Sequence, residues 1–274
     1  MVMTVKINRV IGECTGVKTI SFKLGNNIIP KPGQFVMVWV PGVDEIPMSI
    51  SNYDENGNWS ITVKDVGECT NALQNLKLGD FIGIRGPFGN HFKMPPKALK
   101  HIFLVGGGIG MAPLKFLLNQ LKESGFKVKV IEGAKSKNEL LYLDELVNRK
   151  NKNCEFYCCT DDGSYGQKCF PTKLFEEKIN EIEPVDLKNT IVYTCGPEIM
   201  MYHLFKTCEM HGIELFASLE RIMRCGCGLC GLCAIDPIGI LVCKDGPIFN
   251  LAKLNKMDDF GKYKRDFTGK KIGI

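Results

Sequence analysis

The residues with the most specific chemistry are cysteines grouped late in the chain. The sequence holds 13 cysteines. Three of them have the spacing C-x4-C-x2-C, and a fourth follows after nine further residues, as in plant-type [2Fe–2S] ferredoxins. Two bridged irons need four thiolates from a loop that wraps closely round them, and the glycines between these cysteines allow that wrap. The predicted cluster ligands are Cys225, Cys230, Cys233 and Cys243.

Cys227 lies inside the same run and leaves alternatives open. With Cys230 and Cys233 it gives C-x2-C-x2-C, which is reminiscent of a [4Fe–4S] run, although the C-x3-C-P that should follow is absent. A four-thiolate zinc site is a further alternative, disfavoured because structural zinc prefers two separated C-x2-C pairs. We therefore expect a [2Fe–2S] cluster, with Cys227 as an unligated residue of a tight loop.

A second group of residues is suited to binding a nucleotide. Residues 102–105 form an apolar strand that runs into G-G-G-I-G at 106–110 and then into a helix. Such a turn brings the backbone close to a pyrophosphate and presents unpaired N–H groups, although it lacks the G-x-G-x-x-G spacing. Polar segments at 160–164 and 193–200 also follow strands. All three would lie at the carboxyl edge of one sheet, where ligands of open α/β sheets bind.

Three blocks of sequence must position these residues. Residues 2–97 contain short alternating or apolar runs broken by turns, which predicts an antiparallel β-barrel. From residue 101 strands alternate with helical stretches at 112–124, 140–150 and 197–212, which predicts a parallel α/β sheet. From about residue 218 the chain is rich in cysteine and then basic. We predict a multi-domain protein divided into a barrel (1–97), an α/β nucleotide domain (98–216), a small iron–sulfur domain (217–250) and a basic C-terminal tail (251–274).

Composition narrows the classes of protein to consider. Of 274 residues, 45% are hydrophobic and 24% are charged, which is ordinary for a globular chain. The formal net charge is +5, and most of it lies in residues 251–274, which we expect to be a solvated terminus and not a nucleic-acid-binding arm. No signal peptide or membrane-spanning segment is evident. Together with the odd number of cysteines, this predicts a cytoplasmic protein without disulfides.

The barrel followed by the nucleotide domain resembles the ferredoxin-NADP reductase superfamily over about residues 1–216. The resemblance implies that the glycine-rich turn and a C-G-P-x-x-M segment at 195–200 hold NAD(P)H, with Cys195 beside the nicotinamide ring. The implied residues on this side are Gly106, Gly108, Gly110, Cys195, Gly196, Pro197 and Met200.

The same resemblance implies FAD on the barrel. The superfamily's R-P-x-S segment reads I-P-M-S at 46–49, so the arginine that normally pairs with FAD phosphate is Ile46 here. The V-G-x-G-T loop reads V-G-E-C-T at 66–70, with Cys69 where glycine is usual. The implied FAD-binding residues are Pro47, Ser49, Gly67, Cys69, Thr70 and Gly86.

With the cysteine run included, residues 1–250 resemble the electron-transfer subunits of dihydroorotate dehydrogenase B. Residues 220–233 match E-R-x-M-x-C-G-x-G-x-C-x-x-C, and residues 243–249 match C-x-D-G-P-V/I-F. The resemblance implies a relay in pyrimidine biosynthesis: dihydroorotate, FMN on a catalytic partner subunit, [2Fe–2S], FAD and NAD⁺. It also implies a heterotetramer with two copies of each subunit.

Other functions stay open at this point. One is an FAD/[2Fe–2S] reductase subunit of a cytoplasmic hydrogenase, a sulfide dehydrogenase or a ferredoxin:NADP⁺ oxidoreductase; another is a redox sensor that binds nucleotide without turnover. NADP(H) is not excluded. Glu132 could hold a ribose 2′-OH, whereas Lys135 and Ser136 could hold a 2′-phosphate.

Overall fold

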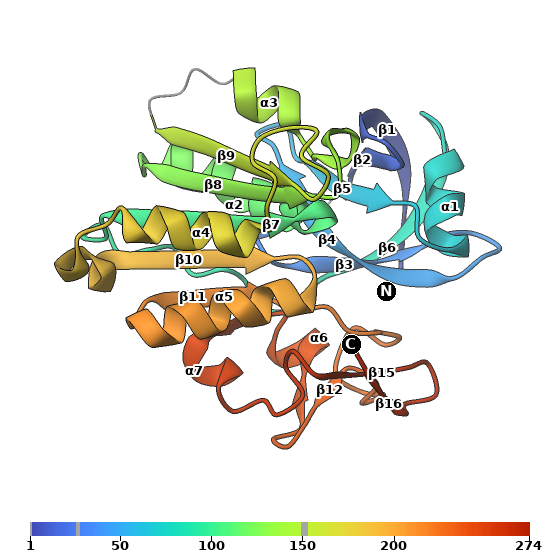
Figure 1. The fold of residues 1–274 in the computed structure, drawn as a ribbon. Coiled ribbons are helices and arrows are strands. Elements are labelled where there is room, and N and C mark those ends of the chain that lie inside the picture. The colour runs from blue at the N-terminus through green and yellow to red at the C-terminus, as the bar shows by residue number, and fades with distance from the viewer. Residues whose placement is uncertain (1, 26–27, 149–152) are drawn as a thin grey trace.

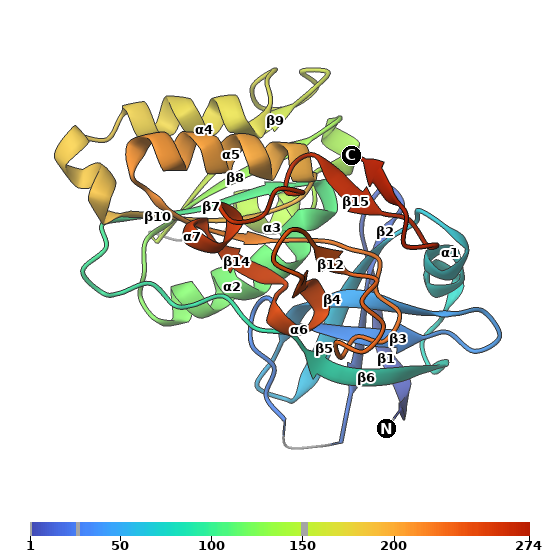
Figure 2. The same cartoon turned by 90° about the horizontal axis from the view of Figure 1, so that it is seen from below.

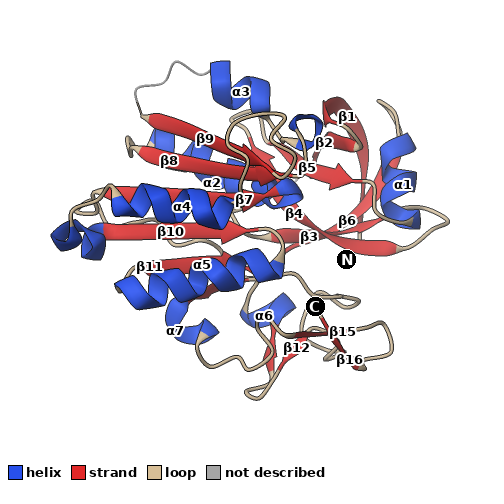
Figure 3. Ribbon diagram, viewed as in Figure 1, coloured by secondary structure: helices blue, strands red, loops and turns tan. Residues whose placement is uncertain are grey.

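The computed structural model describes residues 2–25, 28–148 and 153–274. Over these ranges the chain forms a closed barrel, a six-stranded sheet with helices on both faces, and a C-terminal region of short elements (Figure 1). Helices gather around the six-stranded sheet, whereas loops dominate the C-terminal region (Figure 3). This arrangement confirms the predicted fold class.

The barrel is antiparallel, with strand order β1-β2-β5-β4-β3-β6. Alternate side chains of its strands, such as Ile20, Trp59 and Ile61, are fully buried inside it. Helix α1 (Glu68–Asn75) begins inside the V-G-E-C-T segment at 66–70, which the resemblance implies is an FAD-binding loop. The strands are β1 (Met3–Cys14), β2 (Val17–Lys23), β3 (Phe35–Trp39), β4 (Glu45–Tyr53), β5 (Asn58–Lys64) and β6 (Phe81–Phe88).

The second sheet has the order β14-β11-β10-β7-β8-β9. Its five long strands are parallel, and the central strands β7 and β10 are almost completely buried, as expected for strands covered on both faces. They are β7 (His101–Gly107), β8 (Val128–Ala134), β9 (Cys154–Thr160), β10 (Thr190–Cys195) and β11 (Glu214–Ser218). Strand β14 (Ile248–Asn250) pairs antiparallel with β11. The predicted boundary at 216/217 therefore falls inside β11, and the chain returns to this sheet after the cysteine run.

Helices cover both faces of the sheet. Helices α4 (Pro171–Asn180) and α5 (Glu198–His211) lie side by side on one face, and α2 (Met111–Glu123) lies on the other (Figure 2). Helix α3 (Leu143–Asn148) is shorter than predicted, and residues 149–150 lie outside the described residues. The short 3₁₀ helices are η1 (Gly108–Gly110), η2 (Lys137–Glu139) and η3 (Pro184–Asn189). No helix of the described ranges is long and apolar enough to cross a membrane.

The C-terminal region is folded into short elements and is not an extended tail, although its lysines are exposed to solvent. Phe260 is buried and packs edge-on against Tyr202 and Phe205 of α5. Lys271 reaches the carboxylates of Asp236 and Asp259, so the basic charge is partly neutralised within the fold. The elements here are β12 (Ala234–Ile235), β13 (Ile240–Leu241), α6 (Val242–Asp245), α7 (Leu251–Leu254), β15 (Tyr263–Arg265) and β16 (Lys271–Gly273).

Polar contacts join the barrel to the sheet. Thr62 of β5 hydrogen-bonds the hydroxyl of Tyr142 over 2.6 Å, and Lys64 pairs with Glu139 over 3.0 Å. Tyr142 has a φ of 60° and is the one non-glycine residue in the left-handed region within the described ranges. These contacts set the barrel against the carboxyl edge of the sheet.

Candidate functional site

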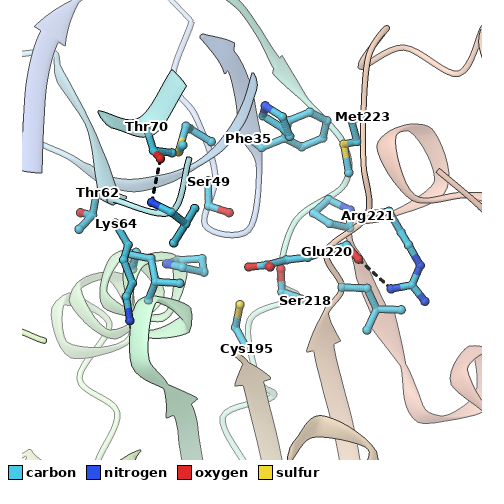
Figure 4. Close-up of a pocket in the computed structure, with 18 residues that line it drawn as sticks. Phe35, Ser49, Thr62, Lys64, Thr70, Cys195, Ser218, Glu220, Arg221 and Met223 are labelled. Atoms are coloured by element: carbon cyan, nitrogen blue, oxygen red, sulfur yellow. Dashed lines mark hydrogen bonds between the residues drawn. The ribbon is translucent and has the colours of Figure 1, made fainter. Parts of the chain in front are cut away.

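A cavity of about 330 Å³ lies where the barrel meets the carboxyl edge of the sheet (Figure 4). The barrel contributes residues of β3, β4 and β5 and the approach to α1, whereas the sheet contributes η1, the start of α2 and the end of β10. The segment that leads into the cysteine run, residues 218–223, closes the third side. All three parts of the fold therefore border one cavity.

Strand register explains the side of the cavity formed by the sheet. Cys195 lies opposite Gly106 of β7 and Ser218 of β11. The cysteine is therefore flanked at the sheet edge by a glycine on one neighbouring strand and a serine on the other. Burial raises the pKa of the Cys195 thiol well above its ordinary value, although a hydrogen bond with Ser218 opposes that shift. The thiol is therefore neutral at physiological pH.

The glycine-rich turn and the C-G-P-x-x-M segment pack directly against each other. A Cβ on Gly110 would lie 2.2 Å from the Cys195 carbonyl oxygen, and one on Gly196 would lie 2.9 Å from the Gly107 nitrogen. A Cβ on Gly106 would collide with the side chain of Met111. Gly108, with a φ of +52°, has open space beside it. Packing thus explains several of these glycines, whereas Gly108 leaves room for a ligand.

The predicted flavin residues divide into those that line the cavity and those that lie near it. Pro47, Ser49 and Thr70 line it. The Thr70 hydroxyl accepts hydrogen bonds from the N–H groups of Val66 and Gly67, each over 2.9 Å, and so shapes the loop from within. The other predicted FAD-binding residues, which do not line the cavity, are Gly67, Cys69 and Gly86. The predicted nicotinamide residues that do not line it are Gly106, Gly108, Gly110, Gly196, Pro197 and Met200.

Cys69 is compatible with a phosphate-binding loop despite its side chain. Its thiol donates to the Asp44 carbonyl oxygen over 3.6 Å and is largely buried, so the side chain points into the barrel wall. The first N–H groups of α1 have no acceptor within the helix, as at any helix N-terminus. The loop can therefore still present backbone donors to an anion.

Two cationic side chains, Lys64 and Arg221, line the cavity, whereas the residue at position 46 is apolar. Ile46 packs against the barrel core, whereas Lys64 at the end of β5 lines the cavity and pairs with Glu139. Arg85 is already engaged, because it binds both oxygens of Glu45 at 2.7 and 2.6 Å and also the Cys225 carbonyl oxygen. Lys64 and Arg85 are thus both ion-paired, and Lys64 is the one of the two that lines the cavity.

Glu220 is a functional candidate that sequence reasoning missed. Its carboxylate points into the cavity beside Ser218 and above Cys195 (Figure 4). Burial and the nearby Glu198 carboxylate raise the pKa of Glu220, and the positive charges of Arg221 and Lys264 oppose that shift. The sequence contained the E-R pair at 220–221, but only the register of β11 with β10 places this carboxylate over the cysteine.

The cysteine run forms a loop whose N–H groups point at sulfur. Gly228 N–H donates to Cys243 Sγ over 3.2 Å, and Leu229 N–H donates to Cys225 Sγ over 3.3 Å. Although burial opposes the shift, such backbone donors lower the pKa of Cys225 to about 6. Glycines in the left-handed region at 226, 228 and 231 make these turns possible.

The four predicted ligands lie as two pairs. Cys230 is close enough to Cys225 to stabilise its thiolate, and Cys233 lies against Cys243. Within the described ranges, no three His, Cys, Asp or Glu side chains are grouped as a site for a single metal ion. Cys227 is exposed.

The structure overturns one interpretation of the nucleotide side. Glu132 is completely buried at the end of β8 and accepts a hydrogen bond from the Leu141 N–H. Burial raises its pKa to about 8, and it cannot reach a ribose hydroxyl. Lys135 is exposed, and Ser136 is half-buried. The polar loop at 160–164 follows the edge strand β9 and does not line the cavity.

Three family models match the chain in succession. Residues 4–93 match an oxidoreductase FAD-binding domain, and residues 104–205 match an oxidoreductase NAD-binding domain. Residues 220–255 match the iron–sulfur cluster binding domain of dihydroorotate dehydrogenase B. These matches confirm the predicted cofactor classes.

Curated relatives match almost the whole chain. A protein of Methanocaldococcus jannaschii, described as a probable dihydroorotate dehydrogenase B (NAD(+)), electron transfer subunit, is 43% identical over 267 residues, which is 97% of this chain and 96% of the relative. A protein of Methanocella arvoryzae with the same description is 40% identical over 271 residues, covering 98% and 97% of the two chains.

Solved structures share the fold. An NADH-dependent reduced ferredoxin-NADP oxidoreductase, described in connection with flavin-based electron bifurcation, is 28% identical with a TM-score of 0.78, covering 93% of this chain and 89% of that one. Ferredoxin-NADP⁺ reductase from Plasmodium falciparum, 18% identical with a TM-score of 0.63, covers 77% and 90% of the two chains and shows the fold alone.

Proposed function

Because the chain belongs to the family of dihydroorotate dehydrogenase B electron transfer subunits, we propose that it carries electrons between a dihydroorotate-oxidising partner and NAD⁺. The chain contributes an FAD-binding barrel, an NAD-binding domain and an iron–sulfur domain. A flavin exchanges hydride with nicotinamide and single electrons with an iron–sulfur cluster, and so can link the two. It is an oxidoreductase subunit and needs its partner for the substrate.

The observation that carries this proposal is the single cavity bordered by all three parts. Glu220 and Met223 line it, and the first predicted cluster ligand, Cys225, follows two residues after Met223. The loop after Cys225 packs against the barrel, since a Cβ on Gly226 would lie 2.8 Å from Met37 Cγ. A flavin in the cavity would therefore lie between the nicotinamide side and the cluster loop.

The residue roles follow from this placement. Pro47, Ser49 and Thr70 would contact FAD, with Lys64 supplying the positive charge that Ile46 lacks, and Gly67, Cys69 and Gly86 shaping the loops behind them. Cys195 and Gly108 would contact the nicotinamide nucleotide, supported by the packing of Gly106, Gly110, Gly196, Pro197 and Met200. The cluster ligands would be Cys225, Cys230, Cys233 and Cys243. We keep the division into domains at 1–97, 98–216 and 217–250, followed by a C-terminal segment at 251–274, as a proposal, although β11 crosses the second boundary.

The partner is a catalytic subunit, as the name of the relatives implies. We propose further that this partner holds FMN, that two copies of each subunit form a heterotetramer, and that the complex works in the cytoplasm. NADH is the favoured nucleotide, and NADPH is the alternative.

Anaerobic purification with and without the co-expressed neighbouring genes tests these cofactors and the partner together. We expect one FAD and one cluster of two irons and two sulfides per chain. NADH should bleach the flavin absorbance. With the partner, the mass should equal two copies of each subunit. Bound flavin that NADH fails to bleach would favour a nucleotide sensor without turnover.

A second candidate rests on the structural neighbour described above. That protein is a reduced ferredoxin-NADP oxidoreductase with the same fold over 93% of this chain. If this chain served such a complex, reduced ferredoxin would reduce its flavin as fast as NADH does, and dihydroorotate would have no effect with any neighbouring gene product. Rapid reduction by dihydroorotate through the partner favours the first function.

A further inference from the structure

Arg221 forms a buried ion pair for which the proposed electron path gives no direct role. Its Nη2 donates to Glu198 Oε1 over 3.0 Å, and its Nη1 donates to Glu198 Oε2 in a second short contact. The two side chains are only 2% and 10% exposed. A buried pair of this kind is expensive to desolvate and is weak evidence for stability. Its geometry therefore calls for another explanation.

The guanidinium joins three segments that are distant in sequence. Glu198 is the first residue of α5 and follows the segment beside the predicted nicotinamide site. Arg221 Nη1 also donates to the Glu220 carbonyl oxygen over 2.7 Å, and Nη2 donates to the Tyr263 carbonyl oxygen over 3.4 Å. The Gly261 N–H donates to Glu198 Oε1 over 2.9 Å. The nicotinamide side, the approach to the cluster loop and the C-terminal segment thus meet at one ion pair.

The placement of Glu220 depends on this junction. Its carbonyl oxygen is held by Arg221, while its carboxylate points into the cavity (Figure 4). The carboxylates of Glu198 and Glu220 repel each other, and Arg221 together with Lys264 of β15 offsets that repulsion. Without the guanidinium, the side chains of Glu198 and Glu220 would lie near each other with no cation between them. The Glu220 carbonyl oxygen would also lose its hydrogen-bond donor.

We propose that Arg221 is a positioning residue for hydride transfer, and that the C-terminal segment 261–264 is part of the framework of the cavity. Arg221 holds the Glu220 backbone so that the carboxylate stays over Cys195, and the C-terminal segment completes the partners of the ion pair. This inference rests on the proposed function, because it assumes that nicotinamide reacts in this cavity. The family model of the iron–sulfur domain ends at residue 255, before these contacts.

The test uses a double substitution, Glu198→Gln with Arg221→Met, in the full chain. Removing one partner alone leaves the other as an unpaired buried charge, whereas replacing both removes the ion pair as a unit. We expect unchanged iron and flavin content and a melting temperature close to that of the wild type. Amide hydrogen exchange at 261–264 should become faster. Anaerobic single-turnover reduction of the flavin by NADH should slow about 10- to 100-fold, the size of effect caused by displacement of about 1 Å.

Two further variants keep the inference falsifiable. Lys100→Met with Asp186→Asn removes an ion pair at the start of β7, away from this junction, and should change neither exchange at 261–264 nor the reduction rate. Arg221→Lys keeps the charge but loses the two-pronged contact, and should slow reduction while retaining both cofactors; it serves if the double variant fails to fold.

Wild-type reduction rates in both Arg221 variants overturn the inference, even if exchange at 261–264 rises. If NADH does not reduce the flavin of the wild-type protein, the proposed function fails instead. In that case the exchange data still decide whether Arg221 holds the C-terminal segment.

Discussion

At the scale of single residues, the cavity is bordered by a buried neutral thiol and by ionisable side chains. Cys195 is buried with a raised thiol pKa, so it offers a neutral contact surface and not a thiolate. The charged groups bordering the cavity are Lys64, Glu220 and Arg221. Two of them have partners outside the cavity, Glu139 and Glu198. The charges of Lys64 and Arg221 are thus held in place before any ligand arrives.

Lys64 carries the first prediction. Lys64→Met should weaken FAD binding about tenfold or more at low salt, because a charge-assisted hydrogen bond to a phosphate contributes about 1.5–3 kcal/mol. The measurement is a titration of the flavin-free chain with FAD at two salt concentrations. Lys100→Met is the matched control, since Lys100 forms an exposed ion pair with Asp186 at the opposite end of β7. Equal affinity in the two variants contradicts the assigned role.

Glu132 carries a prediction about pH. Burial raises its pKa from 4.5 to about 8, so the folded chain holds a proton there that the unfolded chain releases above about pH 4.5. The folded state therefore loses stability as pH rises from about 4.5 to 8, by the order of a few kcal/mol. Glu132→Gln should remove this loss and exceed the wild type in stability at pH 9. Denaturant unfolding from pH 5 to 9 measures it, and parallel curves for the two proteins would refute it.

At the scale of elements, the cysteine loop depends on its glycines. Gly228 has a φ of +86°, and a Cβ there would lie 2.8 Å from Lys244 Cδ. Its N–H also donates to Cys243 Sγ. The loop therefore needs both the backbone conformation and the space that glycine provides.

Gly228→Ala should consequently lose iron on desalting under anaerobic conditions. Gly269→Ala is the control, because Gly269 has the same φ of +86° with nothing within 4 Å of an added Cβ, and lies in the turn between β15 and β16. Both variants bear similar backbone strain, of about 1–2 kcal/mol. If both variants retained iron to the same extent, the prediction that the cluster loop needs glycine at position 228 would be contradicted.

The elements also show what the sequence can predict. Alternating runs predicted the barrel, and apolar runs ending in glycine predicted the parallel sheet, because both depend on local periodicity. Helix α1 was missed because its first residues resemble a phosphate loop. Glu220 and Lys64 were missed as cavity residues because strand register and barrel closure, which are long-range, place them there. The fold of the C-terminal residues was not predicted, since composition does not reveal that Lys271 pairs with Asp259.

At the scale of the whole molecule, the three parts are not independent. Strand β14 extends the nucleotide sheet after the cysteine run, and β5 of the barrel contacts Tyr142 of the nucleotide half. The C-terminal segment closes on the ion pair of Arg221 and Glu198. The barrel, the nucleotide sheet and the approach to the cysteine loop therefore border a shared cavity.

The central claim is tested most directly by dihydroorotate-dependent formation of NADH under anaerobic conditions, with this chain, its co-expressed partner, and both together. We predict that the two subunits together form NADH from NAD⁺ and dihydroorotate, while this chain alone reduces dyes with NADH but leaves dihydroorotate unchanged. Oxidation of dihydroorotate by this chain alone, or NADH formation by the partner alone at the full rate, would contradict the account.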